Sequence, residues 1–357
     1  MSSETPRDDD RWTRRRLLKT AAGLTVAAAL SPNVRAAAPP AASQPAPGSE
    51  PGKKRNIIQI GILLGTFSGP TLEARLDAVR ACGLDCVQVS LDCAGQPAMP
   101  DRIAPELSER IRQAAAARGI EIASVQGTFN MSHPDAEQRR AGVRRLGVLA
   151  AECGRLGTSK IHICTGTRDR DNMWRRHAGN DSPEAWRDMA ACVRAAVELA
   201  KPYRVVLGFE PEVNNVVDSA QKSRRLLDEI GSPYLKVTMD AANLFHAGEL
   251  AHMSEILDRA FALLGKDIVM AHAKDLSHDG DAGHEPAGHG KLDYYRYLSL
   301  LHACGFKGPL LLHGLSPAQV PGCVAFLRET LARVAAAAAK SGPASHALGP
   351  TVAVGTP

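Results

Sequence analysis

The stretch "VVLGFEPEVNN" (Val205–Asn215) is apolar for five residues and then presents Glu210 and Glu212, with one proline between them. The side chains of a β-strand alternate between its two faces, so these two carboxylates would point the same way. Carboxylates at the end of a buried strand are costly unless they are paired or hold a metal ion. The stretch therefore predicts a buried strand that ends in a functional or metal-binding group.

Apolar runs of this kind recur along the chain, and a polar loop and a stretch with helical spacing follow each of them. The eight runs are Ile57–Leu64, Cys86–Leu91, Ile120–Val125, Lys160–Cys164, Val205–Phe209, Leu235–Met239, Ile268–Ala271 and Pro309–Leu312. Helical spacing is found in Thr71–Cys82, Ala104–Arg118, Asp135–Leu156, Pro183–Lys201, Ser219–Ile230, Met253–Leu264, Tyr294–Cys304 and Pro317–Ala337. Eight alternating pairs predict a (β/α)₈ TIM barrel over residues 56–335. The alternative is an open doubly wound sheet, whose nucleotide-binding variant is excluded because no G-x-G-x-x-G follows the first run.

The ends of the chain have a different composition. Residues 1–36 combine a basic start, an apolar stretch too short to cross a bilayer and a small-residue site ending at Ala36, which predicts a signal peptide. Thr13–Lys19 (TRRRLLK) resembles the bacterial twin-arginine signal, so we expect an exported, periplasmic protein. Once the signal is removed, the protein should not be an integral membrane protein. An ordinary secretory signal or an uncleaved anchor is the alternative. Residues 37–55 indicate a flexible linker, and residues 336–357 a disordered Ala/Pro/Gly-rich tail.

Charge and cysteine content exclude several classes of protein. Residues 1–36 hold seven Lys/Arg and four Asp/Glu, which leaves 36 against 34 in the rest of the chain. That balance, without a later basic cluster, argues against a nucleic-acid partner. No C-x-x-C pair occurs among the eight cysteines, so a zinc ribbon or a thioredoxin-type site is excluded, and we expect mainly buried thiols.

Polar residues stand at the ends of the last four predicted strands. These residues are Glu210, Asp240, His272 and His313. In a (β/α)₈ barrel the chemistry lies where the strands end, and four such residues in successive strands are hard to explain as loop caps. A mixed carboxylate and imidazole set suits one divalent ion such as Mn²⁺, Zn²⁺, Co²⁺ or Fe²⁺. Glu212 would lie further out, as a partner of the ligands or a substrate contact, with a structural salt bridge as the alternative.

Several motifs, in this order, resemble the sugar phosphate isomerase/epimerase family of xylose isomerase-like TIM barrels. They are "FNMSHPD", "FEPEVNNVVDSA", "KVTMDAANL", "HAKD", "GHGKLDY" and "GPLLLHGLSPAQVPGCVAFLR". The resemblance implies a metal-dependent enzyme that acts on a carbohydrate. Barrels of this family often pair, so it also admits a homo-oligomer.

The resemblance implies a ligand set at matching positions. Epimerases of this family hold one divalent metal with Glu, Asp, His and Glu, which correspond here to Glu210, Asp240, His272 and His313. His313 stands where a glutamate is usual, and Asn243 stands where these epimerases carry a histidine. A metal site survives the first change because imidazole is a good ligand, but a relay between two matched carboxylates does not.

The chemistry expected of such a site takes place next to a carbonyl group. A divalent ion that chelates adjacent carbonyl and hydroxyl oxygens stabilises the enediolate formed when a neighbouring carbon loses its proton. We expect Glu210 or His313 to move that proton, and Lys274, His246, Glu212 and His162 to contact the substrate. His133, Trp174 and His177 are further candidates for sugar contacts, although each fits a surface or loop-packing role as well.

Three functions follow from this reading. The first is an isomerase or epimerase of a free sugar or keto-sugar, because sugar phosphates are scarce outside the cytoplasm. The second is a metal-dependent lyase that performs β-elimination on 3-keto-glycosides, and the third is a sugar-binding barrel without activity. The DNA-repair endonuclease branch of the fold is disfavoured, since it needs a histidine at position 243.

Overall fold

The computed structural model describes residues 58–341. The predicted signal peptide (residues 1–36), the predicted linker (37–55) and residues 342–357 of the predicted tail lie outside this range. No helix within residues 58–341 is both long and apolar enough to cross a bilayer.

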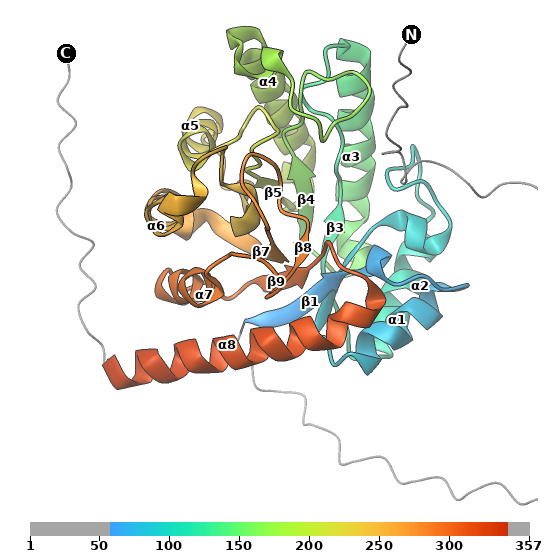
Figure 1. Ribbon diagram of the computed structural model, residues 1–357. Helices are drawn as coiled ribbons and strands as arrows, with labels where there is room; N and C mark the ends of the chain where they lie inside the picture. The colour runs from blue at the N-terminus through green and yellow to red at the C-terminus, as the bar shows by residue number, and fades with distance from the viewer. Residues whose placement is uncertain (1–57, 342–357) are drawn as a thin grey trace, which may run out of the picture. The chain divides into compact units, whose positions relative to one another are not determined.

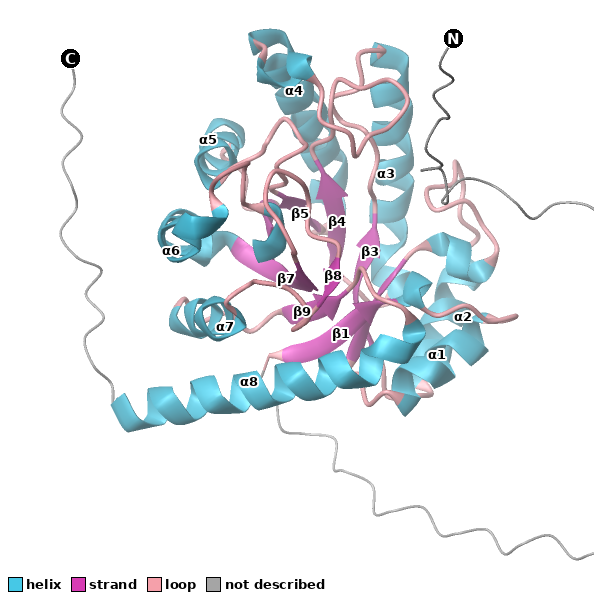
Figure 2. Ribbon diagram, in the orientation of Figure 1, coloured by secondary structure: helices cyan, strands magenta, loops and turns pink. Residues whose placement is uncertain are grey.

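The predicted barrel is confirmed. Eight parallel strands form a closed ring, in which β1 pairs with both β2 and β9 and β6 pairs with β7. Figure 2 shows these strands in the middle of the molecule with the helices around them. The strands are β1 (Gln59–Leu63), β2 (Cys86–Val89), β3 (Glu121–Gln126), β4 (Lys160–Cys164), β5 (Val206–Glu210), β6 (Leu235–Asp240), β7 (Ile268–Asp275) and β9 (Pro309–Leu312), with the two-residue β8 (Glu285–Pro286) outside the ring.

Each predicted helix is present (Figure 1). The helices are α1 (Leu72–Ala81), α2 (Pro105–Ala116), α3 (Ala136–Leu156), α4 (Pro183–Ala200), α5 (Ala220–Ile230), α6 (Met253–Leu264), α7 (Tyr294–Ala303) and α8 (Val320–Ser341). Ser182 and Ser219 begin α4 and α5 by accepting a hydrogen bond from a backbone N–H three residues later. Gly83 and Gly305 adopt φ angles of 71° and 73°, the left-handed conformation predicted for them just after α1 and α7.

Two elements run four residues further than predicted. Strand β7 continues past Ala271 to Asp275, because Lys274 and Asp275 pair with the antiparallel β8 at the mouth of the barrel. Helix α8 reaches Ser341, whereas its predicted end was Ala337 and the tail was expected from residue 336. Alanine has the highest helix propensity of all residues, which explains why the Ala-rich segment remains helical.

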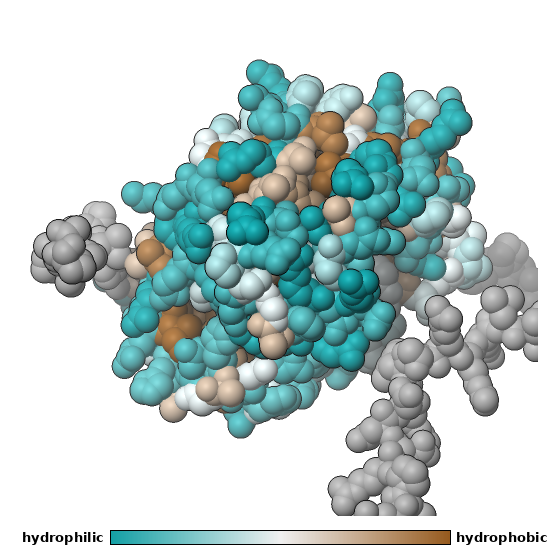
Figure 3. All heavy atoms as spheres, turned by 90° about the horizontal axis from the view of Figure 1, so that it is seen from above, coloured by the Kyte–Doolittle hydropathy of each residue, from teal (hydrophilic) through white to brown (hydrophobic). Residues whose placement is uncertain are grey.

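The core fills the barrel and the layer between strands and helices. Every residue of β2 and β9 is buried, as expected for parallel strands covered on both faces. All eight cysteines lie within the described range as free thiols, and six of them are buried. Figure 3 shows a face that is mainly hydrophilic, with hydrophobic residues in separate patches.

Candidate metal centre and its cavity

Four side chains predicted as ligands meet at the carboxyl end of the barrel. Glu210 ends β5, Asp240 ends β6, His272 lies in β7 and His313 follows β9. The pairing register sets Asp240 opposite His272, so these two residues lie at the same height. One ligand atom from each of Glu210, Asp240, His272 and His313 lies within 4.8 Å of the others, a group that could hold a metal ion.

The contacts within this group leave one imidazole unsatisfied. His313 Nε2 lies 3.2 Å from Asp240 Oδ2. His272 Nδ1 lies 3.6 Å from Glu210 Oε2 and 3.7 Å from Asp240 Oδ2, and neither ring nitrogen of this buried residue makes a hydrogen bond. Buried polar atoms are usually hydrogen-bonded or bound to an ion. The two carboxylates and two imidazoles of this group fit a borderline divalent cation.

The charges of the group depend on one another. Burial opposes the ionisation of both Glu210 and Asp240. The nearby positive charges outweigh this effect: His272 lowers the pKa of Glu210, and Lys274 lowers the pKa of Asp240, in each case well below the usual range. Burial lowers the pKa of His272, but the two carboxylates outweigh that effect and raise it to about 9. Burial and the nearby Lys274 lower the pKa of His313 to about 4. At neutral pH the metal-free group therefore contains two carboxylates, one imidazolium and one neutral imidazole.

Two further side chains hold Glu210 in place. Asn243 donates from Nδ2 to Glu210 Oε1 over 2.6 Å, and His162 Nε2 lies 3.3 Å from Glu210 Oε2. His162 lies in β4, and its Nδ1 is 3.3 Å from Thr238 Oγ1. A glycine at position 208 permits this arrangement, since a Cβ there would lie 2.7 Å from Thr238 Oγ1. His162, which was predicted as a substrate contact, lines the cavity and also contacts Glu210.

Lys274 and Glu212 are both buried beside the group. Lys274 Nζ lies 3.3 Å from Asp240 Oδ2, so this residue is not an exposed lysine of the rim. Glu212 makes no ion pair with any described residue, and burial together with the nearby Glu210 raises its pKa to about 8. The salt-bridge alternative for Glu212 is therefore not supported, whereas its position beside the ligands agrees with the prediction.

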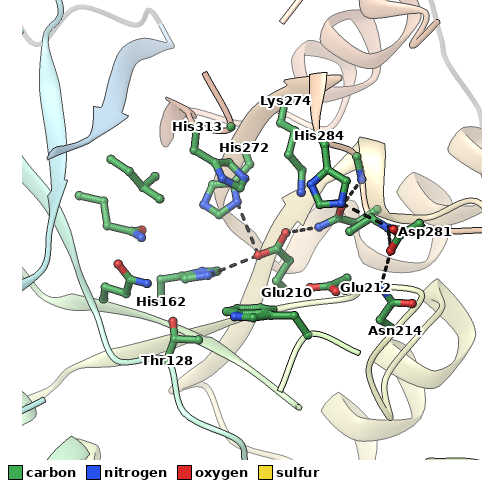
Figure 4. Close-up of a pocket in the computed structure, with 18 residues that line it drawn as sticks. Thr128, His162, Glu210, Glu212, Asn214, His272, Lys274, Asp281, His284 and His313 are labelled. Atoms are coloured by element: carbon green, nitrogen blue, oxygen red, sulfur yellow. Dashed lines mark hydrogen bonds and ion pairs between the residues drawn. The ribbon is translucent and has the colours of Figure 1, made fainter. Parts of the chain in front are cut away.

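A cavity of about 390 Å³ is lined by Glu210, His272, His313, Lys274 and Glu212. Figure 4 shows His272 and His313 together above Glu210, with His162 on one side and Lys274 on the other. Trp174, which is 46% exposed, also lines the cavity, as expected of a residue in the long loop after β4.

Three predicted contacts lie elsewhere. His246 lines a separate pocket with residues of α5 and α6, because the chain turns away from the cavity after the short 3-10 helix Ala241–Asn243. His133 binds the backbone of Asp135, and His177 caps the short helix Ala178–Asp181. The structure does not bring these three histidines to the cavity.

Sequence reasoning missed several residues that line the cavity. They are Gln88, Gln126, Thr128, Asn214, Asp281 and His284. Gln88 could have been found, since it is a polar residue inside the apolar run Cys86–Leu91. Asp281 and His284 lie in the long loop between β7 and α7, where no periodic pattern shows which residues turn inward.

Fold and site together define the class of this protein, a (β/α)₈ barrel that gathers acidic and imidazole groups at the carboxyl ends of its strands. The chain belongs to the xylose isomerase-like TIM barrel family, whose sequence model matches residues 76–342. Comparison with curated protein sequences gives no match.

Solved structures resemble this barrel along most of its length. L-ribulose 3-epimerase is 18% identical with a TM-score of 0.62, and the alignment covers 81% of this chain and 99% of that one. A D-tagatose 3-epimerase-like protein is 14% identical with a TM-score of 0.62, at 78% and 99% coverage. The 3-keto-D-glucoside 4-epimerase from E. coli is 16% identical with a TM-score of 0.59, at 76% and 100% coverage. At these identities the likeness establishes a shared fold.

Proposed function

We propose that this protein is a divalent-metal-dependent isomerase or epimerase that acts on a free sugar or keto-sugar. The group of Glu210, Asp240, His272 and His313 carries the proposal, because it brings four ligand-type side chains together and one of them, His272, makes no hydrogen bond. Family membership and the sugar epimerases among the similar structures support the same reaction class.

Different residues of the cavity would bind the metal, move the proton and position the sugar. A cation held by the four side chains would make a carbon next to a sugar carbonyl more acidic by polarising adjacent oxygens. Glu210 and His313 both line the cavity, and one of them would accept the proton. In an isomerisation the same group would return the proton to the neighbouring carbon, and in an epimerisation the other group would donate a proton to the opposite face of the same carbon. Lys274 and Glu212 would position the sugar's oxygens, and Asn243 and His162 would hold Glu210 in one orientation.

Metal content and isotope exchange test the proposal together. We expect about one equivalent of divalent metal in the purified protein, and deuterium uptake from ²H₂O into a sugar such as D-fructose, D-tagatose or a 3-keto-glucoside, detected by mass spectrometry. Glu210→Ala should lose both properties. His246→Ala is the matched control and should keep both, since His246 lies outside the cavity.

Other outcomes identify the alternatives. Release of the aglycone from a 3-keto-glycoside would show that the reaction is β-elimination and not isomerisation. Bound metal without exchange on any sugar would favour a sugar-binding barrel. A protein that holds no metal even after reloading would overturn the proposed enzyme.

Export to the periplasm remains part of the proposal. Its support is the sequence of residues 1–36, which resembles a twin-arginine signal.

A further inference from the structure

One wall of the cavity carries uncharged hydrogen-bonding groups that have no protein partner. Gln88, at the end of β2, is 2% exposed, and its Oε1 accepts a hydrogen bond from Ser124 Oγ over 2.9 Å. The Nε2 of the same amide makes no hydrogen bond, and neither does the buried Oγ1 of Thr128, which follows β3. Both residues line the cavity. A ligand group that reaches these two atoms would supply the hydrogen-bond partners they lack.

Gln126 extends the same wall. It is the last residue of β3 and is paired in register with His162, so it lies level with a residue that contacts Glu210. Its side chain lines the cavity and makes no hydrogen bond within the described part of the chain. Two amides and one hydroxyl thus stand together at the ends of β2 and β3.

The rest of the cavity wall disfavours an anionic ligand. Asp281 lines it, and its Oδ1 accepts a hydrogen bond from Asn214 Nδ2 over 2.6 Å. No arginine is among the described lining residues, and Lys274, their one lysine, has its Nζ 3.3 Å from Asp240. A phosphate or carboxylate group bound beside Asp281, away from the four proposed metal ligands, would meet a like charge without a lysine or arginine to pair with.

Hydroxyl groups match both sides of this cavity. Each hydroxyl donates one hydrogen bond and accepts two, so it can accept from Gln88 Nε2 and donate to a carboxylate such as Asp281. Figure 4 shows Thr128 and His162 on one side of the cavity, with Asp281 and His284 on the other. A volume of about 390 Å³ lies in the range of small-molecule sites.

We propose that Gln88, Gln126 and Thr128 form a hydroxyl-binding subsite that makes the protein select uncharged sugars over sugar phosphates and sugar acids. The inference rests on the proposed function, in which the reacting carbon of the sugar would lie beside Glu210 and His313. The subsite would bind hydroxyls on the part of the sugar remote from that carbon. The subsite consists of uncharged side chains, so it can be altered by mutation without changing any of the four proposed metal ligands.

Sugar binding measured by titration calorimetry tests the subsite on the full-length, metal-loaded protein. The neutral probes are D-fructose, D-tagatose and methyl 3-keto-β-D-glucoside, and the anionic probes are D-fructose 6-phosphate and D-glucuronate. We expect a neutral probe to bind at least about tenfold more tightly than the anionic ones, the scale of one charged contact. Thr128→Val should then raise the Kd of that probe about three- to tenfold, the usual scale of one neutral hydrogen bond.

Matched controls separate the subsite from general effects on folding. Ser108→Ala also removes a buried hydroxyl without a partner, but Ser108 lies in α2 outside the cavity, so the Kd should not change. Gln88→Met is made together with Ser124→Ala, so that no serine is left without its acceptor. The Ser124→Ala single variant is its control, and only the double variant should bind the neutral probe more weakly.

Each outcome bears on the subsite or on the proposed function. Tighter binding of an anionic probe, or equal Kd values for Thr128→Val and Ser108→Ala, would overturn the subsite while the proposed function stands. Failure of every probe to bind the metal-loaded protein would overturn the proposed function, and the subsite with it. Weaker binding in the wall variants at unchanged metal content supports both.

Discussion

Asn243 donates a hydrogen bond from Nδ2 to Oε1 of Glu210 over 2.6 Å, and its own Oδ1 accepts one from the backbone N–H of Gly283. This amide therefore links the proposed ligand of β5 to the loop between β7 and α7. Epimerases that the sequence resembles carry a histidine at this position. The amide occupies Oε1 and leaves Oε2 as the Glu210 oxygen nearest to His272.

We predict that Asn243→Ala weakens metal binding about 10- to 100-fold, the usual effect of losing a hydrogen-bond partner of a metal ligand. Metal affinity can be measured by calorimetric titration of the metal-free protein. Asn214→Ala is the control, because it removes another amide-to-carboxylate bond in the same cavity, to Asp281. Equal losses of affinity in the two variants would contradict a specific role for Asn243.

Metal affinity should rise with pH. The raised pKa of His272, about 9, keeps this imidazole protonated at neutral pH, and a ligand must be neutral, so the metal has to displace a proton. The lowered pKa values of Glu210, Asp240 and His313 mean that these groups need no deprotonation near pH 7. Between pH 6 and 8 we expect an affinity gain of about tenfold per pH unit, the slope for one displaced proton. Calorimetry in two buffers with different ionisation enthalpies should detect about one released proton, and zero protons would contradict the assignment.

Lys274 should stabilise the metal-free protein. Lys274→Met leaves the buried Asp240 without its ammonium partner, and breaking a buried pair in this way costs about 3 kcal/mol. The loss in free energy of unfolding, measured with urea in a chelator, should shrink when Mn²⁺ is added, because the cation then compensates the carboxylate.

Lys236→Met is the matched control for that experiment. Lys236 pairs with Asp267 over 2.5 Å at a site where both side chains are partly exposed, so about 1 kcal/mol or less should be lost, without a response to metal. Equal losses in the two variants, each insensitive to Mn²⁺, would show that Lys274 does not compensate charge at the metal centre.

Export should depend on the paired arginines near the start of the chain. Replacing Arg14 and Arg15 by lysine is expected to retain the protein in the cytoplasm of a bacterial host, because the twin-arginine pathway recognises that pair. Fractionation of cells expressing the two forms provides the measurement. Periplasmic recovery of the lysine variant would instead indicate an ordinary secretory signal.

The fold was predictable because each barrel strand is an apolar run between turn signals. The length of β7 was not, since Lys274 and Asp275 extend it by pairing with β8, a long-range contact that local sequence does not encode. Helical alanines in α8 likewise gave no sign of where the helix stops.

The ligand group was predictable because strand ends converge in a barrel, whereas the rest of the cavity depends on loop geometry. His246 shows the limit: it follows β6 by only a few residues, yet the turn at Ala241–Asn243 directs it to another pocket. Thr128 shows the opposite case: it lines the cavity, although in the sequence a threonine shortly after a strand resembles an ordinary loop residue.

The eight free thiols have a consequence for how the protein would acquire its metal. A chain without cross-links needs no oxidant to reach its native state, so folding can be completed before transport. The twin-arginine pathway would then carry a finished barrel, with its ion already enclosed among Glu210, Asp240 and His272. The metal ions available in the cytoplasm, rather than competition between metal ions in the periplasm, would then decide which metal the enzyme uses.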